Sequence, residues 1–367
     1  MAHWRARVAA TLAAASLLLA TGSLANAIGQ ANVAAGQAVL IPGATVFKPI
    51  NPFYRAIATS YPKIGMHFHD DTSPTVVAYS QNALAADRAV RDGVRQTKAA
   101  VRGTDAEVVV IGESMGSMVA WRVARELAGD NDAPSPADVS FVLIAPPEMG
   151  VAEYFKAGTF IPILNYRVRR IEPSPYPTTI VIGEYDGWAD PPDRPWNLLA
   201  SANALAGIAY VHGPPIAAVD PDTVPEQNIT RVPATAQHGP ITTYFVPTRN
   251  LPLTQPFRDL GVPNTLVDKV DRMLRPAIDA GYVRHDKPGD TRPYLRDGEL
   301  RRNVQSQQSA REPQEQADEP DTAQQRGTSD SAVRDADPPV PVQADSDEVG
   351  DLAEQQAEPQ ESEDAGE

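Results

Sequence analysis

One segment constrains the fold of this chain more than any other: a β-branched run, a glycine turn and an apolar helical pattern follow one another directly. The run covers residues 107–111 and the turn is Gly-Glu-Ser-Met-Gly at 112–116. Apolar residues then recur at helical spacing as far as Leu127, and Gly129 offers a C-terminal cap. A strand that passes through a tight turn into a helix predicts a unit of a parallel α/β sheet.

The rest of the sequence repeats this alternation. Continuous apolar runs predict strands at 37–43, 139–145, 178–183 and 242–246, and a shorter apolar stretch at 64–69 is a further strand candidate. Helical spacing marks 81–101, 196–209 and 265–280. Buried strands alternating with helices predict a mostly parallel sheet with helices on both faces. The irregular apolar stretch 151–177 between two of these strands could cap a site.

The glycine turn places a serine where it can act as a nucleophile. Residues 112–116 match G-x-S-x-G, in which a strained strand-to-helix turn exposes the serine hydroxyl above the sheet. The pentapeptide alone is a weak signal, but here it follows a predicted strand and opens a predicted helix. We therefore predict that Ser114 is a nucleophile, with a structural glycine turn as the alternative.

A serine nucleophile needs a base and an acid later in the chain, in the order Ser, acid, His. The loop after strand 178–183 carries Asp186 and, four residues later, Asp190. We favour Asp186 as the acid and keep Asp190 as the alternative. Among the histidines after the serine, His212 and His238 each lie beside a glycine in a predicted loop. Spacing alone does not decide between these two histidines.

The oxyanion formed during such catalysis needs two N–H donors. The first donor should be the backbone N–H of Met115, which follows the nucleophile. For the second donor we predict the loop after the first strand, at 43–45, and specifically Thr45. This chemistry needs neither a cofactor nor a metal ion.

Several blocks of the sequence resemble the PE-PPE-type hydrolase domain of mycobacteria and related actinobacteria, a cutinase-like branch of the α/β hydrolases. The similar blocks are 112–117, 183–191, 196–198, 203–212, 243–245 and 251–253. The resemblance implies an α/β-hydrolase fold over roughly 37–282 and an esterase of acyl esters, or transfer of acyl groups between envelope lipids such as acylated trehaloses. A sugar hydroxyl would then be the acyl acceptor. The Tyr-Val-His212 ending of one block also favours His212 over His238.

The two ends of the chain differ from its middle. Residues 1–27 predict a secretory signal peptide: two arginines, an apolar run at 8–20 and an Ala-Asn-Ala cleavage pattern ending at Ala27. A retained membrane anchor is the alternative, so we expect a secreted or envelope protein. We place the hydrolase domain at 37–285 and an acidic disordered tail at 286–367. From residue 301 onward this tail has 18 acidic residues, 5 arginines and no aromatic residue.

Composition excludes some functions and leaves two rivals. The chain has no cysteine, which excludes thiol catalysis, zinc-thiolate sites and iron–sulfur clusters. Nucleic-acid binding has no support because the net charge is −15 and no basic patch stands out. A metal-dependent hydrolase could use His67 and His69 if they share one face of a strand. The second rival is a non-catalytic envelope-binding protein on a hydrolase fold.

Overall fold

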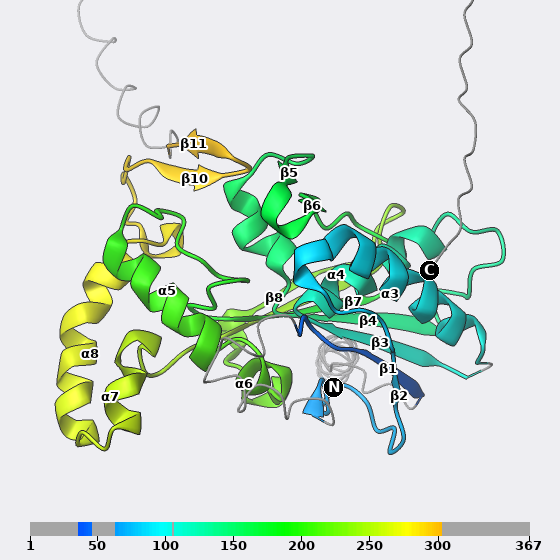
Figure 1. Ribbon diagram of the computed structural model, residues 1–367, viewed down its shortest axis with the longest axis horizontal. Coiled ribbons are helices and arrows are strands. Elements are labelled where there is room, and N and C mark those ends of the chain that lie inside the picture. Colours follow the sequence, from blue (N-terminus) through cyan, green and yellow to red (C-terminus); the bar gives the residue numbers. More distant parts are fainter. Residues whose placement is uncertain (1–35, 46–62, 105, 303–367) are drawn as a thin grey trace, which may run out of the picture. The chain divides into compact units, whose positions relative to one another are not determined.

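The computed structural model describes residues 36–45, 63–104 and 106–302, and within them seven strands form one sheet (Figure 1). In spatial order the strands are β2 (Thr75–Val76), β1 (Gln37–Ile41), β3 (Val108–Glu113), β4 (Val139–Ile144), β7 (Thr178–Gly183), β9 (Ile241–Val246) and β8 (Ile229–Val232). Neighbouring strands are parallel except at one edge, where β8 runs antiparallel to β9. The predicted mostly parallel α/β sheet is confirmed.

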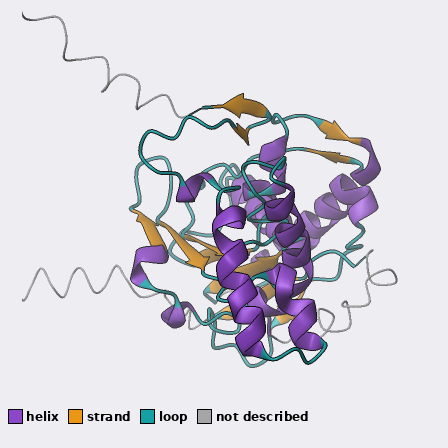
Figure 2. Ribbon diagram, turned by 90° about the vertical axis from the view of Figure 1, so that its left-hand side faces the viewer, coloured by secondary structure: helices purple, strands orange, loops and turns teal. Residues whose placement is uncertain are grey.

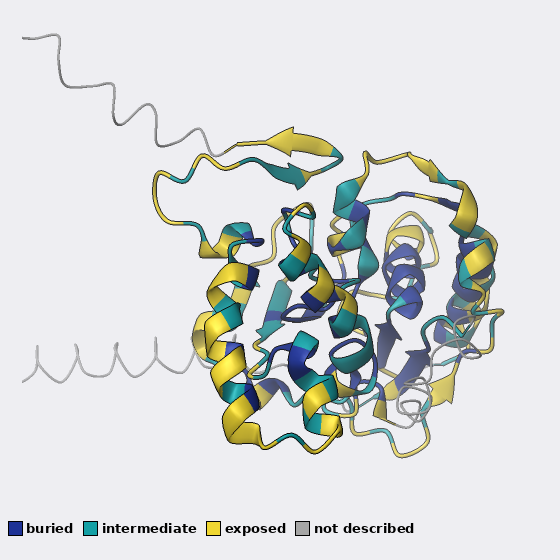
Figure 3. Ribbon diagram, turned by 60° about the vertical axis from the view of Figure 1, so that its left-hand side comes forward, coloured by how far each residue is buried: buried dark blue, intermediate teal, exposed yellow. Residues whose placement is uncertain are grey.

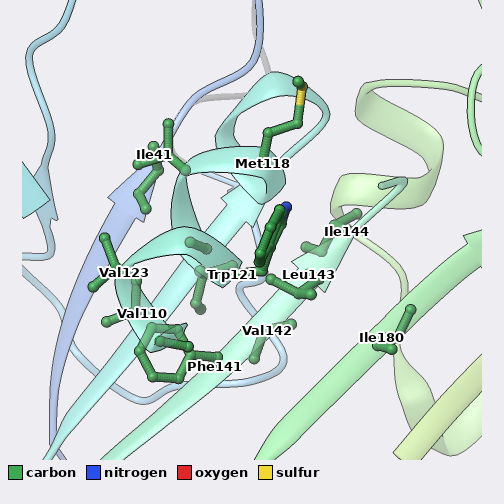
Figure 4. Close-up of a cluster of buried hydrophobic side chains, with 14 of the residues drawn as sticks. Ile41, Val110, Met118, Trp121, Val123, Phe141, Val142, Leu143, Ile144 and Ile180 are labelled. Atoms are coloured by element: carbon green, nitrogen blue, oxygen red, sulfur yellow. The ribbon is translucent and has the colours of Figure 1, made fainter. Parts of the chain in front are cut away.

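Two long helices cover one face of this sheet (Figure 1). Helix α3 (Ala86–Arg102) buries the apolar stripe predicted from its spacing, including Val90 and Val94. Helix α4 (Met115–Leu127) lies between α3 and the strands, so it is buried on almost every side. In Figure 4 the side chains of Trp121 and Val123 lie among residues of the neighbouring strands. Packing in the hydrophobic core therefore holds the helix that follows the glycine turn in place.

The opposite face of the sheet carries the short helix α6 (Pro214–Ala217) and the turn at 63–69, which are joined by a hydrogen bond from the Gly65 N–H to the Ala217 carbonyl (2.7 Å). The prediction of a strand at 64–69 is wrong. Gly65 has a φ of +61° and the chain turns back on itself there, with the Phe68 N–H bound to the Gly65 carbonyl. The apolar residues of this stretch are buried because the turn packs on the sheet, with Phe68 edge-on to Tyr244 of β9.

A second group of helices lies beside the sheet: α5 (Leu198–Tyr210), α7 (Gln255–Asp259) and α8 (Asn264–Asp279), seen from their own side in Figure 2. They surround a small separate core made of Tyr185, Ala200, Leu251, Ile278 and Tyr282. The predicted domain boundary at 285 falls inside the described chain. Further along, β10 (Tyr294–Arg296) and β11 (Glu299–Arg301) form a hairpin in which β11 is exposed and β10 is partly buried (Figure 3). A buried ion pair between Arg194 and Asp286 (2.6 Å) ties this segment to the domain.

The chain between β4 and β7 makes few regular structures. It contains the short 3₁₀ helices η3 (Pro147–Met149), η4 (Val151–Tyr154) and η5 (Pro162–Leu164), with the two-residue strands β5 (Phe160–Ile161) and β6 (Tyr166–Arg167) paired to each other. We call residues 146–168 the cap. The other 3₁₀ helices are η2 (Ala83–Ala85), η6 (Pro221–Thr223), η7 (Glu226–Asn228), η8 (Pro252–Thr254) and η9 (Val283–His285). Among all described helices, none has both the length and the apolarity to cross a membrane.

The predicted signal peptide at 1–27 and the part of the predicted tail beyond residue 302 lie outside the described residues.

Candidate active site

Ser114 occupies a strained turn between β3 and α4. Its φ of +56° and ψ of −120° are unusual for a residue with a side chain, and such strain collects at functional sites. The two glycines of the pentapeptide allow this geometry. A Cβ atom on Gly112 would lie 2.2 Å from the Gly116 carbonyl oxygen, and one on Gly116 would lie 2.0 Å from the Ile41 carbonyl oxygen. The motif therefore has both glycines for steric reasons, and Ser114 stays partly exposed.

The structure brings Ser114, His212 and Asp186 together. The Ser114 hydroxyl lies 2.8 Å from His212 Nε2, and the opposite ring nitrogen, Nδ1, lies 2.7 Å from Asp186 Oδ2. Asp186 is fully buried, and its Oδ1 accepts hydrogen bonds from the N–H groups of Trp188 (2.9 Å) and Ala189 (3.3 Å). These contacts hold the carboxylate in one orientation. The arrangement can remove a proton from the serine hydroxyl and stabilise the imidazolium that results.

The alternative residues are engaged elsewhere. Asp190 Oδ2 accepts the Tyr185 N–H (2.7 Å), and Oδ1 pairs with Arg284 (2.7 Å). Burial raises the pKa of Asp190 to about 7, although Arg284 opposes this. The His238 ring bonds the carbonyl oxygen of its neighbour Gly239 (2.8 Å). In the described structure, neither Asp190 nor His238 contacts the serine.

Electrostatics around His212 suit a base. Burial lowers the pKa of this imidazole, but the carboxylate of Asp186 and its hydrogen bond, helped by the charge of Glu113, raise the pKa above its usual value of 6.5. Glu113 is itself almost fully buried beside the serine, and burial raises the pKa of its carboxyl group. Its Oε2 accepts the Gly43 N–H (3.3 Å). Glu113 is not among the site residues predicted from the sequence, although a carboxylate that ends an apolar strand just before the nucleophile is a visible signal.

The predicted oxyanion donors differ in their availability. Met115 is the first residue of α4 and lines the cavity in front of Ser114. The backbone N–H of Thr45, predicted as the second donor, is already used: it donates to the Gln81 carbonyl (3.0 Å). Its neighbour Ala44 also lines the cavity. The Ala44 N–H is therefore the better candidate for the second oxyanion donor. The hydrogen bond from the Gly43 N–H to Glu113 holds this loop in place.

A cavity of about 320 Å³ opens in front of the serine. Its lining is mostly apolar and comes from the cap, from α3, α4 and α5, and from the turn at 63–69. The cap contributes Pro147, Glu148, Val151, Ala152, Phe155, Ile161, Leu164, Tyr166 and Val168. The size and apolarity are those of a small-molecule site. The stretch 151–177 thus covers the cavity, as its position in the sequence suggests.

A further ionisable side chain lies in the wall of the cavity. Glu148 lines it, is buried, and accepts a hydrogen bond from Tyr166 (2.8 Å). Burial raises the pKa of Glu148 to about 7.

His67 and His69, the residues of the alternative metal-site hypothesis, lie in the turn rather than in a strand, so they do not share a strand face. Within the described residues no group of three or more ligating side chains could hold a metal ion.

Comparison with known protein families identifies a domain in this chain. The PE-PPE domain model matches residues 52–283, which is more than half of the sequence.

The chain belongs to the PE-PPE domain family.

This PE-PPE domain is 38% identical over 264 residues to the uncharacterized PPE family protein PPE63 of Mycobacterium tuberculosis, covering 67% of the chain and 54% of that protein. It is 39% identical over 216 residues to the diacyltrehalose acyltransferase Chp2 of the same species (56% of the chain, 59% of Chp2). It is 34% identical over 243 residues to the esterase PE16, again of that species (64% of the chain, 44% of PE16). The PE-PPE chain thus spans about half the length of these relatives.

Proposed function

We propose that this PE-PPE domain is a serine esterase or acyltransferase that acts on acyl esters, with cell-envelope lipids as its substrates. One observation carries the proposal: the Ser114 hydroxyl, on a strained turn, is hydrogen-bonded at 2.8 Å to His212, which Asp186 orients from behind. The serine faces a cavity whose mostly apolar lining suits an acyl chain.

In the proposed reaction His212 takes the hydroxyl proton while Ser114 Oγ attacks the ester carbonyl. The N–H groups of Met115 and Ala44 would stabilise the oxyanion. The C–O bond to the alcohol then breaks, His212 returns its proton to the leaving alcohol, and the acyl group stays on Ser114. Water or a second alcohol attacks this acyl-serine with His212 again as the base.

The relatives support both fates of the acyl-serine. Chp2 is named as an acyltransferase on diacyltrehalose and PE16 as an esterase. A sugar hydroxyl is therefore the acceptor that we propose for transfer. The cap covers an apolar cavity, which limits the access of water and favours a competing alcohol.

We also propose that the protein works outside the cytoplasm, in the secreted fraction or the envelope. This rests on the signal-peptide pattern of residues 1–27, with retention as a membrane anchor as the alternative, and on the envelope-lipid substrates. Detection of the mature N-terminus after Ala27 in the culture filtrate would support cleavage, whereas an intact leader in the membrane fraction would support anchoring.

Labelling with a fluorophosphonate tests the catalytic serine. We expect the wild-type protein to be labelled, Ser114→Ala to lose the label, and Ser201→Ala to keep it. Ser201 is a matched control because its hydroxyl donates to the Pro195 carbonyl (2.8 Å) and lies outside the cavity. An unlabelled but folded wild-type protein would instead support the non-catalytic envelope-binding alternative.

Hydrolysis and transfer are separated by the product. The purified protein is incubated with a long-chain acyl donor, with and without trehalose. New acylated sugar in the second tube supports transfer. Free fatty acid alone in both tubes would restrict the proposal to an esterase.

A further inference from the structure

The outer side of the cap and its neighbour η2 expose large apolar side chains. Ile163 in η5 is 76% exposed, Leu84 in η2 is 49% exposed and Phe160 in β5 is 46% exposed. Segments η2 and η5 are in contact, and β5 directly precedes η5; β5 is labelled in Figure 1. We call these three side chains the cap rim. Exposed apolar residues gathered in this way mark an interaction site more often than scattered ones do.

The cap rim and part of the cavity wall are built from the same short segments, η2, β5 and η5. Each rim residue is adjacent in sequence to a residue that lines the cavity: Leu84 to Ala83, Phe160 to Ile161, and Ile163 to Leu164. Phe155, also in the cap, lines the cavity and is itself 36% exposed. The same short segments therefore present apolar side chains both to the exterior and to the cavity in front of Ser114.

Basic side chains accompany the rim. The Arg167 guanidinium lies over the Phe160 ring, 5.8 Å from its centroid, and its Nη1 donates to the Gly158 carbonyl (2.7 Å). Within the described chain Arg167 forms no salt bridge. Lys156 is also exposed and pairs with Glu299 (3.1 Å). An apolar ring beneath a cation that has no salt-bridge partner in the described chain is suited to the boundary between acyl chains and anionic headgroups.

We propose that the cap rim docks on a lipid surface and passes an acyl chain directly from it into the cavity. This inference rests on the proposed function, because it deepens the substrate class of the same site. A lipid surface fits better than a protein partner. The exposed rim side chains are apolar and have the Arg167 cation beside them, and the segments that carry them also line a cavity that suits an acyl chain.

Vesicle binding tests the docking without any catalysis. The full chain carrying Ser114→Ala is sedimented with phosphatidylcholine vesicles that contain or lack phosphatidylglycerol. The double variant Phe160→Asp with Ile163→Asp should lower the vesicle partition coefficient about tenfold or more. Two apolar side chains that would leave water on docking are replaced by charged side chains that stay hydrated. Leu260→Asp is the matched control: this residue is 81% exposed, but it follows α7, away from the cap. The control should bind like the parent.

Enzyme turnover then tests whether docking supplies substrate to the active site. With Ser114 intact, the double variant should lose activity on an ester presented in vesicles by the same factor, while hydrolysis of a soluble short-chain ester stays unchanged. Equal vesicle binding by the parent and the double variant, or a dimer that forms through the rim with no vesicle binding, would overturn the docking. Rim-dependent binding by a protein that turns over no ester would leave the docking standing and refute the proposed catalysis.

Discussion

The sheet end that carries Ser114 and the cap that covers it are built in opposite ways. The sheet end consists of the carboxyl ends of the parallel strands β3, β4 and β7 and the loops that follow them, with β4 between the other two strands. Backbone hydrogen bonds fix the starts of these loops, such as that from the Ser114 N–H to the Ile144 carbonyl. The cap consists of single 3₁₀ turns and two-residue strands, and several of its apolar side chains face outward. The difference suggests that the two regions have separate roles: the sheet end fixes the reacting groups, and the cap selects the substrate.

Packing explains why the sheet end tolerates little change. The carbonyl of Ile41 approaches Gly116 so closely that no side chain fits there, and Gly187 and Gly207 likewise meet backbone oxygens of α5 and of Tyr185. The cap glycine Gly158, by contrast, has open space around its Cβ position. Substitutions at the sheet end should therefore affect the chemical step, and substitutions in the cap should affect the choice of acyl chain.

The largest effect should come from the acid at the sheet end. Asp186→Asn should lower kcat by about 10⁴-fold, because the amide no longer holds His212 in the tautomer that accepts the serine proton. Asp190→Asn, four residues away, should leave kcat far closer to wild type, since Asp190 contacts Tyr185 and Arg284 instead of the histidine. Both are measured on a soluble ester after a thermal-melting check. Equal losses in the two variants would contradict the assignment of Asp186.

The sequence predicts the sheet end better than the partners of Ser114. The strand, glycine turn and helix are local, so their pattern is readable in one stretch. The choice between Asp186 and Asp190 depends on Arg284, which lies 94 residues beyond Asp190 and pairs with it. Thr45 was predicted as a donor, but the Gln81 carbonyl takes its N–H. Such long-range contacts leave no periodic signal.

The cap shows the same limit in a different form. Its apolar residues have neither helical nor alternating spacing, because they serve two surfaces, the cavity and the exterior, on turns of irregular direction. Position in the chain suggested a cover over the site. Which side chains face inward, such as Ala152, and which face outward, such as Ile163, follows only from the fold.

The next effect concerns pH. His212 must be neutral to accept the proton, so kcat/KM should fall about tenfold per pH unit below the pKa of this imidazole. Because that pKa is raised, the midpoint should lie above 6.5. Glu113→Gln removes one raising charge and keeps an acceptor for the Gly43 N–H, so the midpoint should move to lower pH. The shift should be smaller than the one caused by loss of the Asp186 charge, since Asp186 contributes more than Glu113 to raising this pKa.

A distant carboxylate provides the control for this titration. Glu226→Gln changes an exposed residue of η7 whose partner is Arg231, and solvent screens it from the site. Its pH profile of kcat/KM should coincide with that of the wild type. A midpoint that moves equally in both variants would show that overall charge, rather than Glu113, sets the titration.

The narrowest effect, limited to one class of substrate, should come from the cap. Ala152 is 5% exposed and lines the cavity, so Ala152→Leu places extra carbon atoms in the space proposed for the acyl chain. We expect kcat/KM for a long-chain ester to fall about tenfold, the effect of a one- or two-methylene misfit, and kcat/KM for a short-chain ester to change little. Ala157→Leu, at an exposed position of the same cap, should change neither. If Ala152→Leu lowered the short-chain and long-chain rates equally, the cap would be acting on the reacting groups themselves, and the division between the two regions would be wrong.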